Sequence, residues 1–472
     1  MGETLHCDVA VIGAGTAGLA AERAARANGA STLLIDPAFN GTTCATVGCM
    51  PSKLLIAAAH RARAVRTAGP FGIGVGDVAI DGPAVLQRVR DERDRFARLT
   101  RQSFKDLPAG IAIKARARFT APGRLALDDG RCVAADRVII ATGSSPVLPP
   151  AFAVLGDRVR TSDTIFEMDD LPRRLAVVGS GAIGLELAQA FAHLGVETTL
   201  FDRAERMGGL RCARVHERLQ AIIAADLDLK LGVEVTPHAE ENSARIEWSD
   251  GEGEAGEAQY DLVLAALGRS PQLADLDLDA AEIACDKKGV PFHDRRTMRC
   301  GNSAVFLAGD VASDLPLLHE ASHDGAIAGR NAAAYPAPVA AERHVPFSMI
   351  FTEPTVATIG APEDEGAVTG TADFDDQGRA RVEGRNAGLL TLHAAAPDGR
   401  LIGADMVAPA GEHLAHMLAW AIQEGRTASE LLSLPFYHPT IEEGLKNALR
   451  TICQATPIDL PQDQDAGTPP GA

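Results

Sequence analysis

The stretch "CDVAVIGAGTAGLAAERAARANGASTLLID", residues 7–36, decides the fold. An apolar run leads into Gly13, Gly15 and Gly18, and an alanine-rich segment then leads to a second apolar run that ends at Asp36. This order predicts a strand, a glycine turn, a helix and a strand. The glycines allow the tight turn, the approach of a pyrophosphate to backbone N–H groups, and close helix packing. Asp36 is placed to accept hydrogen bonds from a ribose, so a dinucleotide site is predicted here.

Residues 175–202, "LAVVGSGAIGLELAQAFAHLGVETTLFD", repeat this pattern. The glycines are Gly179, Gly181 and Gly184, and the acid is Asp202. One glycine pattern is weak evidence, because glycine turns are common. Both copies, however, place the acid 23 residues after the first glycine, which disfavours two unrelated turns. Two nucleotide sites in one chain indicate one bound cofactor and one mobile cofactor.

Three further apolar runs end in glycine. Residues 137–146, "RVIIATGSSP", and 261–271, "DLVLAALGRSP", form a second matched pair, and "AVFLAGDVA" covers 304–312. Polar groups just past the carboxyl end of a strand lie at the edge where α/β sheets bind ligands. The residues singled out at these ends are Ala141, Thr142, Gly143, Gly268, Gly309 and Asp310.

The segment "GTTCATVGCMPSK", residues 41–53, places Cys44 and Cys49 five positions apart, before a predicted helix. A metal site would need further ligands at metal spacing, and no histidine or second cysteine pair flanks the segment. A structural disulfide is disfavoured in a reducing compartment. A redox pair fits best, because a helix N-terminus favours a nearby thiolate by lowering its pKa.

Composition limits the other function classes. The chain has 472 residues and a net charge of −18, which predicts several domains and argues against nucleic acid or an anionic membrane as the main partner. No signal peptide and no apolar run of transmembrane length are evident, which predicts a cytoplasmic protein. The six remaining cysteines are expected to be plain thiols.

Taken together, these motifs and "HPTIEE" at 438–443 resemble the flavoprotein pyridine nucleotide–disulfide oxidoreductases, and among them most closely the dihydrolipoyl dehydrogenases. The resemblance covers residues 5–453. It implies an α/β fold with two Rossmann-like dinucleotide-binding domains and a C-terminal α+β dimerisation domain. The implied domains are 1–150 (FAD binding, with the cysteine pair), 151–270 (NAD binding), 271–343 (return to the FAD or central domain), 344–455 (interface) and a disordered tail at 456–472.

The resemblance also implies roles for single residues. Tightly bound FAD would occupy the first glycine turn and a nicotinamide nucleotide the second, in a homodimer without metal. Cys49 would face the flavin, and Cys44 would exchange with the substrate. His438, oriented by Glu443, would move a proton at the disulfide of the other subunit, and the His438–Pro439 bond is predicted to be cis. The other residues implied at the flavin and the nucleotides are Thr43, Lys53, Glu186 (paired with Lys53), Asp36, Asp310, Asp202 and Arg203.

The nicotinamide and the substrate are less sharply specified. Asp202 favours NAD over NADP, although Arg203 and Arg206 follow it. A lipoyl-bearing protein or a small dithiol is the first expectation, and reduction of another disulfide by NAD(P)H is the alternative. Mercuric reductase is disfavoured because its C-terminal vicinal cysteine pair is missing. A redox sensor without turnover is a further alternative, disfavoured because the acid–base pair is present. The departures from the usual dihydrolipoyl dehydrogenase pattern are Thr42, Thr46, Leu318 and Tyr437.

The remaining sequence suggests several elements. A long charged helix is predicted over 86–107, and a hairpin with an acidic tip over 247–261. Strands are predicted from 346 to 360 and helices from 411 to 434, where Leu, Met and Trp420 are expected to be buried in the dimer contact.

Overall fold

The protein is described by a computed structural model that covers residues 3–361, 366–396 and 398–456. The chain divides into two compact units. One unit contains the residues up to Leu54, Gln87–Val147 and Gly268–Arg343. The other contains Leu55–Leu86, Leu148–Leu267 and the chain from His344.

The first unit is built on a largely parallel sheet in the order β17-β18-β19-β6-β1-β2-β3. The alternation of apolar runs and helix predicted at the N-terminus produces β1, α1 and β2, with β1 parallel to both β2 and β6. β19 pairs in parallel with β6, so the chain returns to this sheet late in the sequence. Its strands are β1 (Thr4–Ile12), β2 (Thr32–Asp36), β3 (Ala112–Lys114), β4 (Ala117–Ala121), β5 (Arg124–Leu127), β6 (Cys132–Ile140), β17 (His293–Asp294), β18 (Arg299–Cys300) and β19 (Val305–Leu307).

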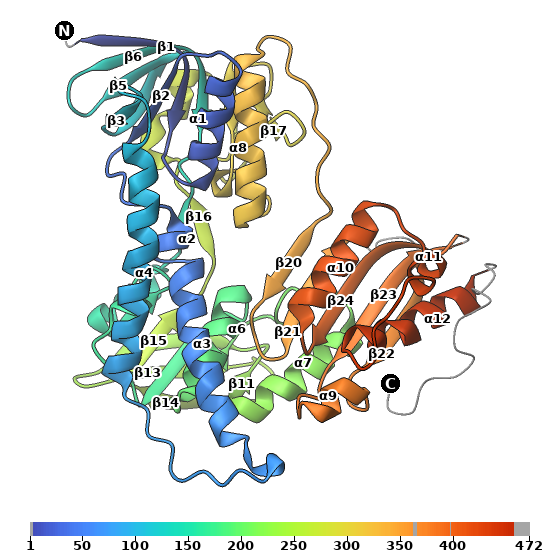
Figure 1. Ribbon diagram of the computed structural model, residues 1–472. Helices are drawn as coiled ribbons and strands as arrows, with labels where there is room; N and C mark the ends of the chain where they lie inside the picture. The colour runs from blue at the N-terminus through green and yellow to red at the C-terminus, as the bar shows by residue number, and fades with distance from the viewer. Residues whose placement is uncertain (1–2, 362–365, 397, 457–472) are drawn as a thin grey trace. The chain divides into compact units, whose positions relative to one another are not determined.

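Helices cover one face of this sheet. Figure 1 shows α1 (Thr16–Ala27) beside α8 (Leu318–Ala333), and their alanines pack on the valine and isoleucine side chains of β1 and β6. The opposite face packs against β4, β5 and the short turns that follow residue 273. A small two-stranded sheet, β7 (Ser144–Pro146) with β16 (Arg269–Pro271), joins the two segments predicted as a matched pair. The cysteine segment forms α2 (Thr43–Thr46) and the start of α3 (Cys49–Arg66), and the predicted charged helix is α4 (Gly82–Lys105).

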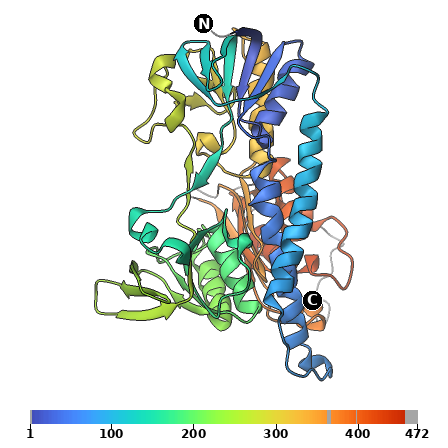
Figure 2. The same ribbon diagram turned by 90° about the vertical axis from the view of Figure 1, so that its left-hand side faces the viewer.

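The second unit contains a parallel sheet in the order β11-β10-β9-β15-β8, flanked by α6 (Ala182–His193) and α7 (Ala213–Asp226). Its strands are β8 (Val159–Thr161), β9 (Arg174–Val178), β10 (Glu197–Phe201), β11 (Asp228–Lys230) and β15 (Leu262–Ala265). Figure 2 shows the antiparallel meander that precedes β15, made of β12 (Glu234–Ala239), β13 (Ala244–Ser249) and β14 (Ala255–Tyr260). The predicted acidic hairpin is confirmed as β13 and β14.

The C-terminal part of this unit is an antiparallel sheet in the order β20-β21-β24-β23-β22. Its strands are β20 (Phe347–Ile350), β21 (Thr355–Gly360), β22 (Val368–Asp373), β23 (Leu389–Ala395) and β24 (Arg400–Ala408). It shares an apolar core with α10 (Gly411–Gln423), α11 (Ala428–Leu432) and α12 (Leu445–Ala455), and α9 (Gly378–Val382) lies between β22 and β23 in the chain.

The predicted fold class, two Rossmann-like domains followed by a C-terminal α+β domain, is confirmed. The predicted disordered tail lies outside the described residues, apart from Thr456. Within the described ranges, no helix combines the length and the apolar character that a membrane span requires.

Candidate active site

Both glycine turns form the same backbone cradle. Gly13 has φ 103° and Gly179 has φ 107°, a region that L side chains rarely adopt. A Cβ on Gly18 would overlap the carbonyl oxygen of Gly13, so only glycine lets the helix lie this close to the strand. Gly15, in contrast, faces open space before the first turn of α1 and caps it without a side chain. This leaves backbone N–H groups at a helix N-terminus directed at a free volume, which fits the pyrophosphate of a dinucleotide.

The second turn repeats this geometry. Gly184 lies against the carbonyl oxygen of Gly179, as Gly18 does against Gly13. Gly181 faces open space and caps α6 without a side chain. The chain therefore carries two equivalent cradles, one in each unit.

The acids that end the two second strands also have equivalent contacts. The Asp36 carboxylate accepts a hydrogen bond from the backbone N–H of Ala14 at 3.0 Å, and the Asp202 carboxylate accepts one from that of Ser180 at 2.6 Å. Asp202 also accepts from the Ser180 hydroxyl at 2.7 Å. Each acid thus fixes the turn of its own βαβ unit. These contacts with the turns were not predicted from the sequence, which indicated only that both acids bind a ribose.

The carboxyl ends of β6 and β19 come together beside the first cradle. The Ser144 hydroxyl donates to Asp310 at 3.0 Å, and Arg269 donates to the same hydroxyl at 2.9 Å. The Thr142 hydroxyl donates to the carbonyl oxygen of Gln272 at 2.6 Å. A Cβ on Gly309 would overlap the side chain of Ala17 in α1. The predicted residues Ala141, Thr142, Gly143, Gly309 and Asp310 therefore follow the carboxyl ends of β6 and β19, and they could line the rest of a dinucleotide. Gly268 lies at the other end of the ribbon formed by β7 and β16, where its carbonyl oxygen accepts from the N–H of Val147 at 2.9 Å.

Cys44 and Cys49 lie across the break between α2 and α3. Thr42 caps α2, and the N–H of Gly48 donates to the carbonyl oxygen of Thr43 at 2.8 Å, which curls the chain back on itself. Cys44 lies in α2, Cys49 is the first residue of α3, and both are present as thiols. The Cys44 side chain is hydrogen-bonded to Cys49. Thr43 is exposed at the start of α2.

The pKa of Cys44, which lies in α2 ahead of this helix start, is raised above its ordinary value, and the lowering of a thiol pKa at the start of α3 itself stays a prediction. The hydrogen bond with Cys49 raises the pKa of Cys44 most, and burial raises it further. The charge of Lys53, one turn into α3, opposes this shift without reversing it. The hydrogen bond and the burial both favour the protonated form of the Cys44 thiol.

His438 and Glu443 form the second polar group of the predicted site. Nδ1 of His438 lies 3.0 Å from the Glu443 carboxylate, which is buried and also accepts from the backbone N–H of Thr440 at 3.2 Å. Lys446 approaches the same carboxylate at 3.8 Å. The imidazole is exposed, and the His438–Pro439 bond is cis, as predicted. A buried acid thus orients an accessible imidazole whose other nitrogen is available to a reacting partner.

Glu186 is buried on α6, where its carboxylate accepts from the backbone N–H of Phe351 at 2.9 Å. Its pairing with Lys53 would join the two units and stays a prediction.

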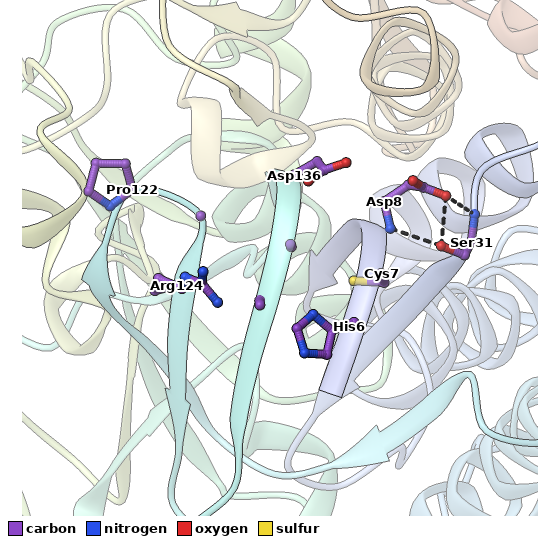
Figure 3. A pocket seen from close by; sticks show the side chains of 10 residues that line it. His6, Cys7, Asp8, Ser31, Pro122, Arg124 and Asp136 are labelled. Atoms are coloured by element: carbon purple, nitrogen blue, oxygen red, sulfur yellow. Dashed lines mark hydrogen bonds between the residues drawn. The ribbon is translucent and has the colours of Figure 1, made fainter. Parts of the chain in front are cut away.

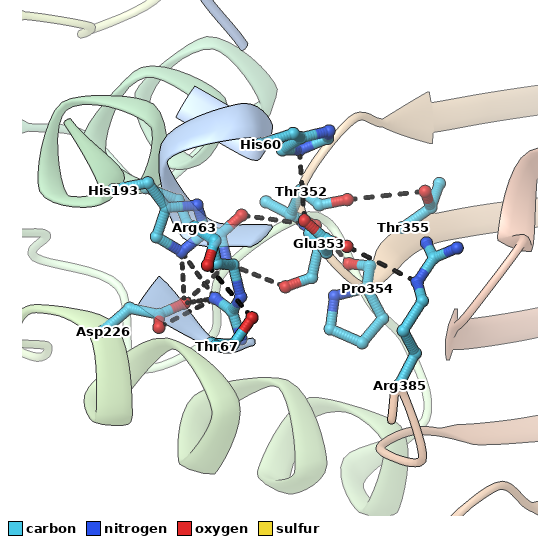
Figure 4. A network of polar contacts seen from close by, with 11 residues as sticks. His60, Arg63, Thr67, His193, Asp226, Thr352, Glu353, Pro354, Thr355 and Arg385 are labelled. Carbon is cyan, nitrogen blue, oxygen red and sulfur yellow. Dashed lines mark hydrogen bonds and ion pairs between the residues drawn. The ribbon is translucent and has the colours of Figure 1, made fainter. Parts of the chain in front are cut away.

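A network that the sequence did not indicate surrounds the same helix (Figure 4). Gln189 donates to Asp226 at 2.8 Å and to the carbonyl oxygen of Glu353 at 2.9 Å. Arg63 of α3 donates to both oxygens of Asp226 at 2.9 and 2.8 Å, and Nε2 of His193 lies 3.0 Å from that carboxylate. Because these partners are far apart in the chain, no motif could have revealed them.

A separate cavity of about 470 Å³ lies beside the first half of β1, with His6, Cys7, Asp8 and Ser31 in its wall (Figure 3). Burial raises the pKa of Cys7 to about 12, and Asp8 is engaged with Ser31 at 2.7 Å. In the parts of the chain that the structure describes, no cluster of His, Cys, Asp and Glu could hold a metal ion.

Comparisons with known proteins agree with this geometry. Residues 7–325 match the profile of the pyridine nucleotide-disulphide oxidoreductases, and residues 346–449 match the dimerisation domain of the same proteins. A mercuric reductase of Acidithiobacillus ferrooxidans is 33% identical over 95% of this chain and 83% of its own length. A dihydrolipoyl dehydrogenase of Haloferax volcanii is 31% identical over 93% and 95%.

A solved structure has the same fold. It is a Cu(II) complex of the HOCl-induced flavoprotein disulfide reductase RclA of Escherichia coli, with a TM-score of 0.80 at 22% identity, covering 94% of this chain and 99% of the other.

Proposed function

Because this chain belongs to the pyridine nucleotide-disulphide oxidoreductases, flavoproteins that bind FAD and use a pyridine nucleotide, we propose that it transfers electrons between a dithiol and NAD through Cys44 and Cys49. Dihydrolipoyl groups are the proposed substrate, as in the Haloferax volcanii relative. The observation that carries this proposal is the hydrogen bond between the two thiols at the start of α3.

The roles of the two sulfurs follow from thiol–disulfide exchange. In the oxidised enzyme, a substrate thiolate attacks Cys44, the Cys44–Cys49 bond breaks, and Cys49 leaves as a thiolate. The second substrate thiol then displaces Cys44, which releases the substrate as a disulfide and leaves both cysteines reduced. The raised pKa of Cys44 supports this division, since it favours the protonated form of Cys44 after the substrate has left.

His438 of the partner subunit would take the proton from the substrate thiol during this exchange. The carboxylate of Glu443 would hold the imidazole in orientation and stabilise the imidazolium that forms. The dimerisation domain at residues 346–449 supports the homodimer that this arrangement needs.

The two cradles would hold the nucleotides. FAD would occupy the turn at Gly13, Gly15 and Gly18 with Asp310 beside it, and when bound it supplies the electron acceptor that the thiols lack. NAD would occupy the turn at Gly179, Gly181 and Gly184. The negative charge of Asp202 favours a ribose hydroxyl over a 2′-phosphate at that position, which supports NAD rather than NADP.

The direct test is reduction of NAD⁺ by the purified protein with dihydrolipoamide. We expect rapid NADH formation by the wild type and its loss in the Cys44→Ser variant, because the mixed disulfide cannot form. The variant should keep bound FAD and should still transfer electrons from NADH to an artificial dye, which serves as the control for folding. Full dithiol activity in Cys44→Ser would refute the assignment of the cysteines.

The His438→Gln variant tests the acid–base step. We expect the dithiol reaction to slow by about 10²–10⁴-fold, the usual contribution of a positioned general base. NADH-dependent dye reduction should stay within about twofold of the wild type, because it does not involve that proton. An equal loss of both activities would indicate a structural defect instead.

A second candidate is the reduction of another substrate at the expense of NAD(P)H, and the 33% identity to mercuric reductases favours testing Hg(II). Cys453 is the last cysteine in the 472 residues, and no other cysteine lies beside it. NADPH oxidation that depends on Hg(II), together with no response to dihydrolipoamide, would favour this candidate.

A further inference from the structure

Asp405 of β24 is fully buried and lies next to the loop that joins β10 to α7. Its carboxylate accepts hydrogen bonds from the backbone N–H groups of Arg211 at 3.1 Å and Cys212 at 2.6 Å. It also accepts from Nε and Nη2 of the Arg211 guanidinium at 3.2 and 3.0 Å. A buried carboxylate with four N–H donors fixes the position of the segment that supplies them.

Arg211 is held from the other side as well. Its guanidinium donates to the carbonyl oxygens of Gly360 at 2.7 Å and Ile359 at 3.2 Å, both in β21. The antiparallel sheet therefore anchors Arg211, the last residue of the loop, two positions before α7 begins at Ala213, and α7 lies close to β23 and β24 (Figure 1).

The loop from 203 to 211 starts directly after Asp202. Midway, the N–H of Gly208 donates to the carbonyl oxygen of Ser180 at 3.0 Å, so the loop lies against the glycine turn. The Arg206 guanidinium donates to the carbonyl oxygen of Arg211 at 3.1 Å. Arg206, one of the two arginines that follow Asp202, is therefore engaged with the end of its own loop, at the residue that Asp405 holds in place.

We propose that Asp405 is a positioning residue for nucleotide choice. By fixing Arg211, Asp405 keeps in place the carbonyl oxygen that accepts from Arg206, so that Arg206 stays engaged within its own loop and does not meet a nucleotide phosphate. This inference rests on the proposed use of NAD. It adds a residue that influences nucleotide choice and lies outside the glycine motif, on the antiparallel sheet β20-β21-β24-β23-β22, called the dimerisation sheet below. Release of Arg211 would free Arg206 to meet a 2′-phosphate.

The test compares kcat/KM for NADH and NADPH in dye reduction by the holoenzyme. In Asp405→Asn, we expect the kcat/KM for NADH divided by that for NADPH to fall by roughly tenfold, the usual contribution of one charge-assisted hydrogen bond. The gain with NADPH should disappear in the double variant with Arg206→Ala. A merely structural defect would lower both values together and leave the ratio unchanged.

Arg218→Gln is the matched control. Arg218 also links α7 to the dimerisation sheet, through Asp373 at 3.1 Å and Asp375 at 2.6 Å, but it lies outside the loop. Its ratio should equal that of the wild type. If Asp405→Asn does not fold, Arg211→Lys, which loses the forked guanidinium contacts, should give the same fall in the ratio.

An unchanged ratio in the folded variants, or a fall in Arg218→Gln of the same size, would overturn the role of Asp405. A wild-type preference for NADPH would instead overturn the proposed use of NAD.

Discussion

Gly15 and Gly18 stand three residues apart, yet the structure assigns them different tasks. A methyl group at residue 18 would overlap the backbone of the turn, whereas one at residue 15 would point into open space. In saturating FAD, we therefore expect Gly18→Ala to be destabilised by about 1–3 kcal/mol, the usual cost of overpacking.

Gly15→Ala should unfold near the wild-type midpoint in saturating FAD, but should bind FAD at least about tenfold more weakly, because its methyl group faces the pyrophosphate.

Thermal unfolding and titration of released FAD by fluorescence would check both expectations. Wild-type affinity in Gly15→Ala would show that the pyrophosphate does not lie over that helix start.

Helices α3, α6 and α7 are joined by the network around Asp226. Burial by itself would raise the pKa of this carboxyl, but the hydrogen bond from His193 and the charge of Arg63 bring it below its ordinary value. A depressed pKa stabilises the fold at pH values above the pKa of the unfolded chain, and this stability is lost as the pH falls through the pKa of the folded state. The loss is therefore expected below about pH 4.

We expect Asp226→Asn to be less stable than the wild type by about 1–3 kcal/mol at neutral pH, because it leaves Arg63 without its ionic partner. The difference should shrink as the pH falls below about 4. Denaturant midpoints measured across pH would check this. Asp228→Asn, which removes an exposed ion pair with Lys230, should leave the midpoints close to those of the wild type.

At the scale of the whole molecule, the burial of Trp420 in a dimer contact stays a prediction, because the structure describes a single chain. Its side chain is 65% exposed, and it borders a largely apolar cavity of about 630 Å³ with Met417, Leu434 and Tyr437 in its wall. An apolar surface of this kind on a dimerisation domain is expected to be covered by a second copy of the chain.

Trp420→Glu should therefore weaken the dimer, because it would bury a charge in the contact. We expect a shift to monomer in sedimentation velocity, with loss of dithiol activity but retention of dye reduction by NADH. Val154→Glu, at an exposed apolar residue of the nucleotide domain, is the control and should remain a dimer. A Trp420→Glu dimer with full dithiol activity would place the contact elsewhere.

The sequence was sufficient for the two nucleotide folds, because glycine spacing and strand periodicity are local signals. His438 and Glu443 also lie close in the chain, so their contact could be anticipated from the pattern. The direction of the pKa shift of Cys44 could not be anticipated, because it depends on the side-chain contact with Cys49 and on burial. The contact of Asp226 with Arg63 and that of Asp405 with Arg211 each join residues more than 150 positions apart, and no periodicity in the sequence records such pairs.

The two glycine turns present the same backbone groups and the same kind of acid, so the turns by themselves do not explain a difference in nucleotide dissociation rate. A resident cofactor and one that is exchanged at every turnover must differ in dissociation rate, and that difference has to arise beyond the turns. Beside the first turn, Thr142, Ser144, Arg269 and Asp310 join three separate stretches of chain. We therefore expect the lifetime of a bound nucleotide to follow the number of chain segments that must separate before it can leave.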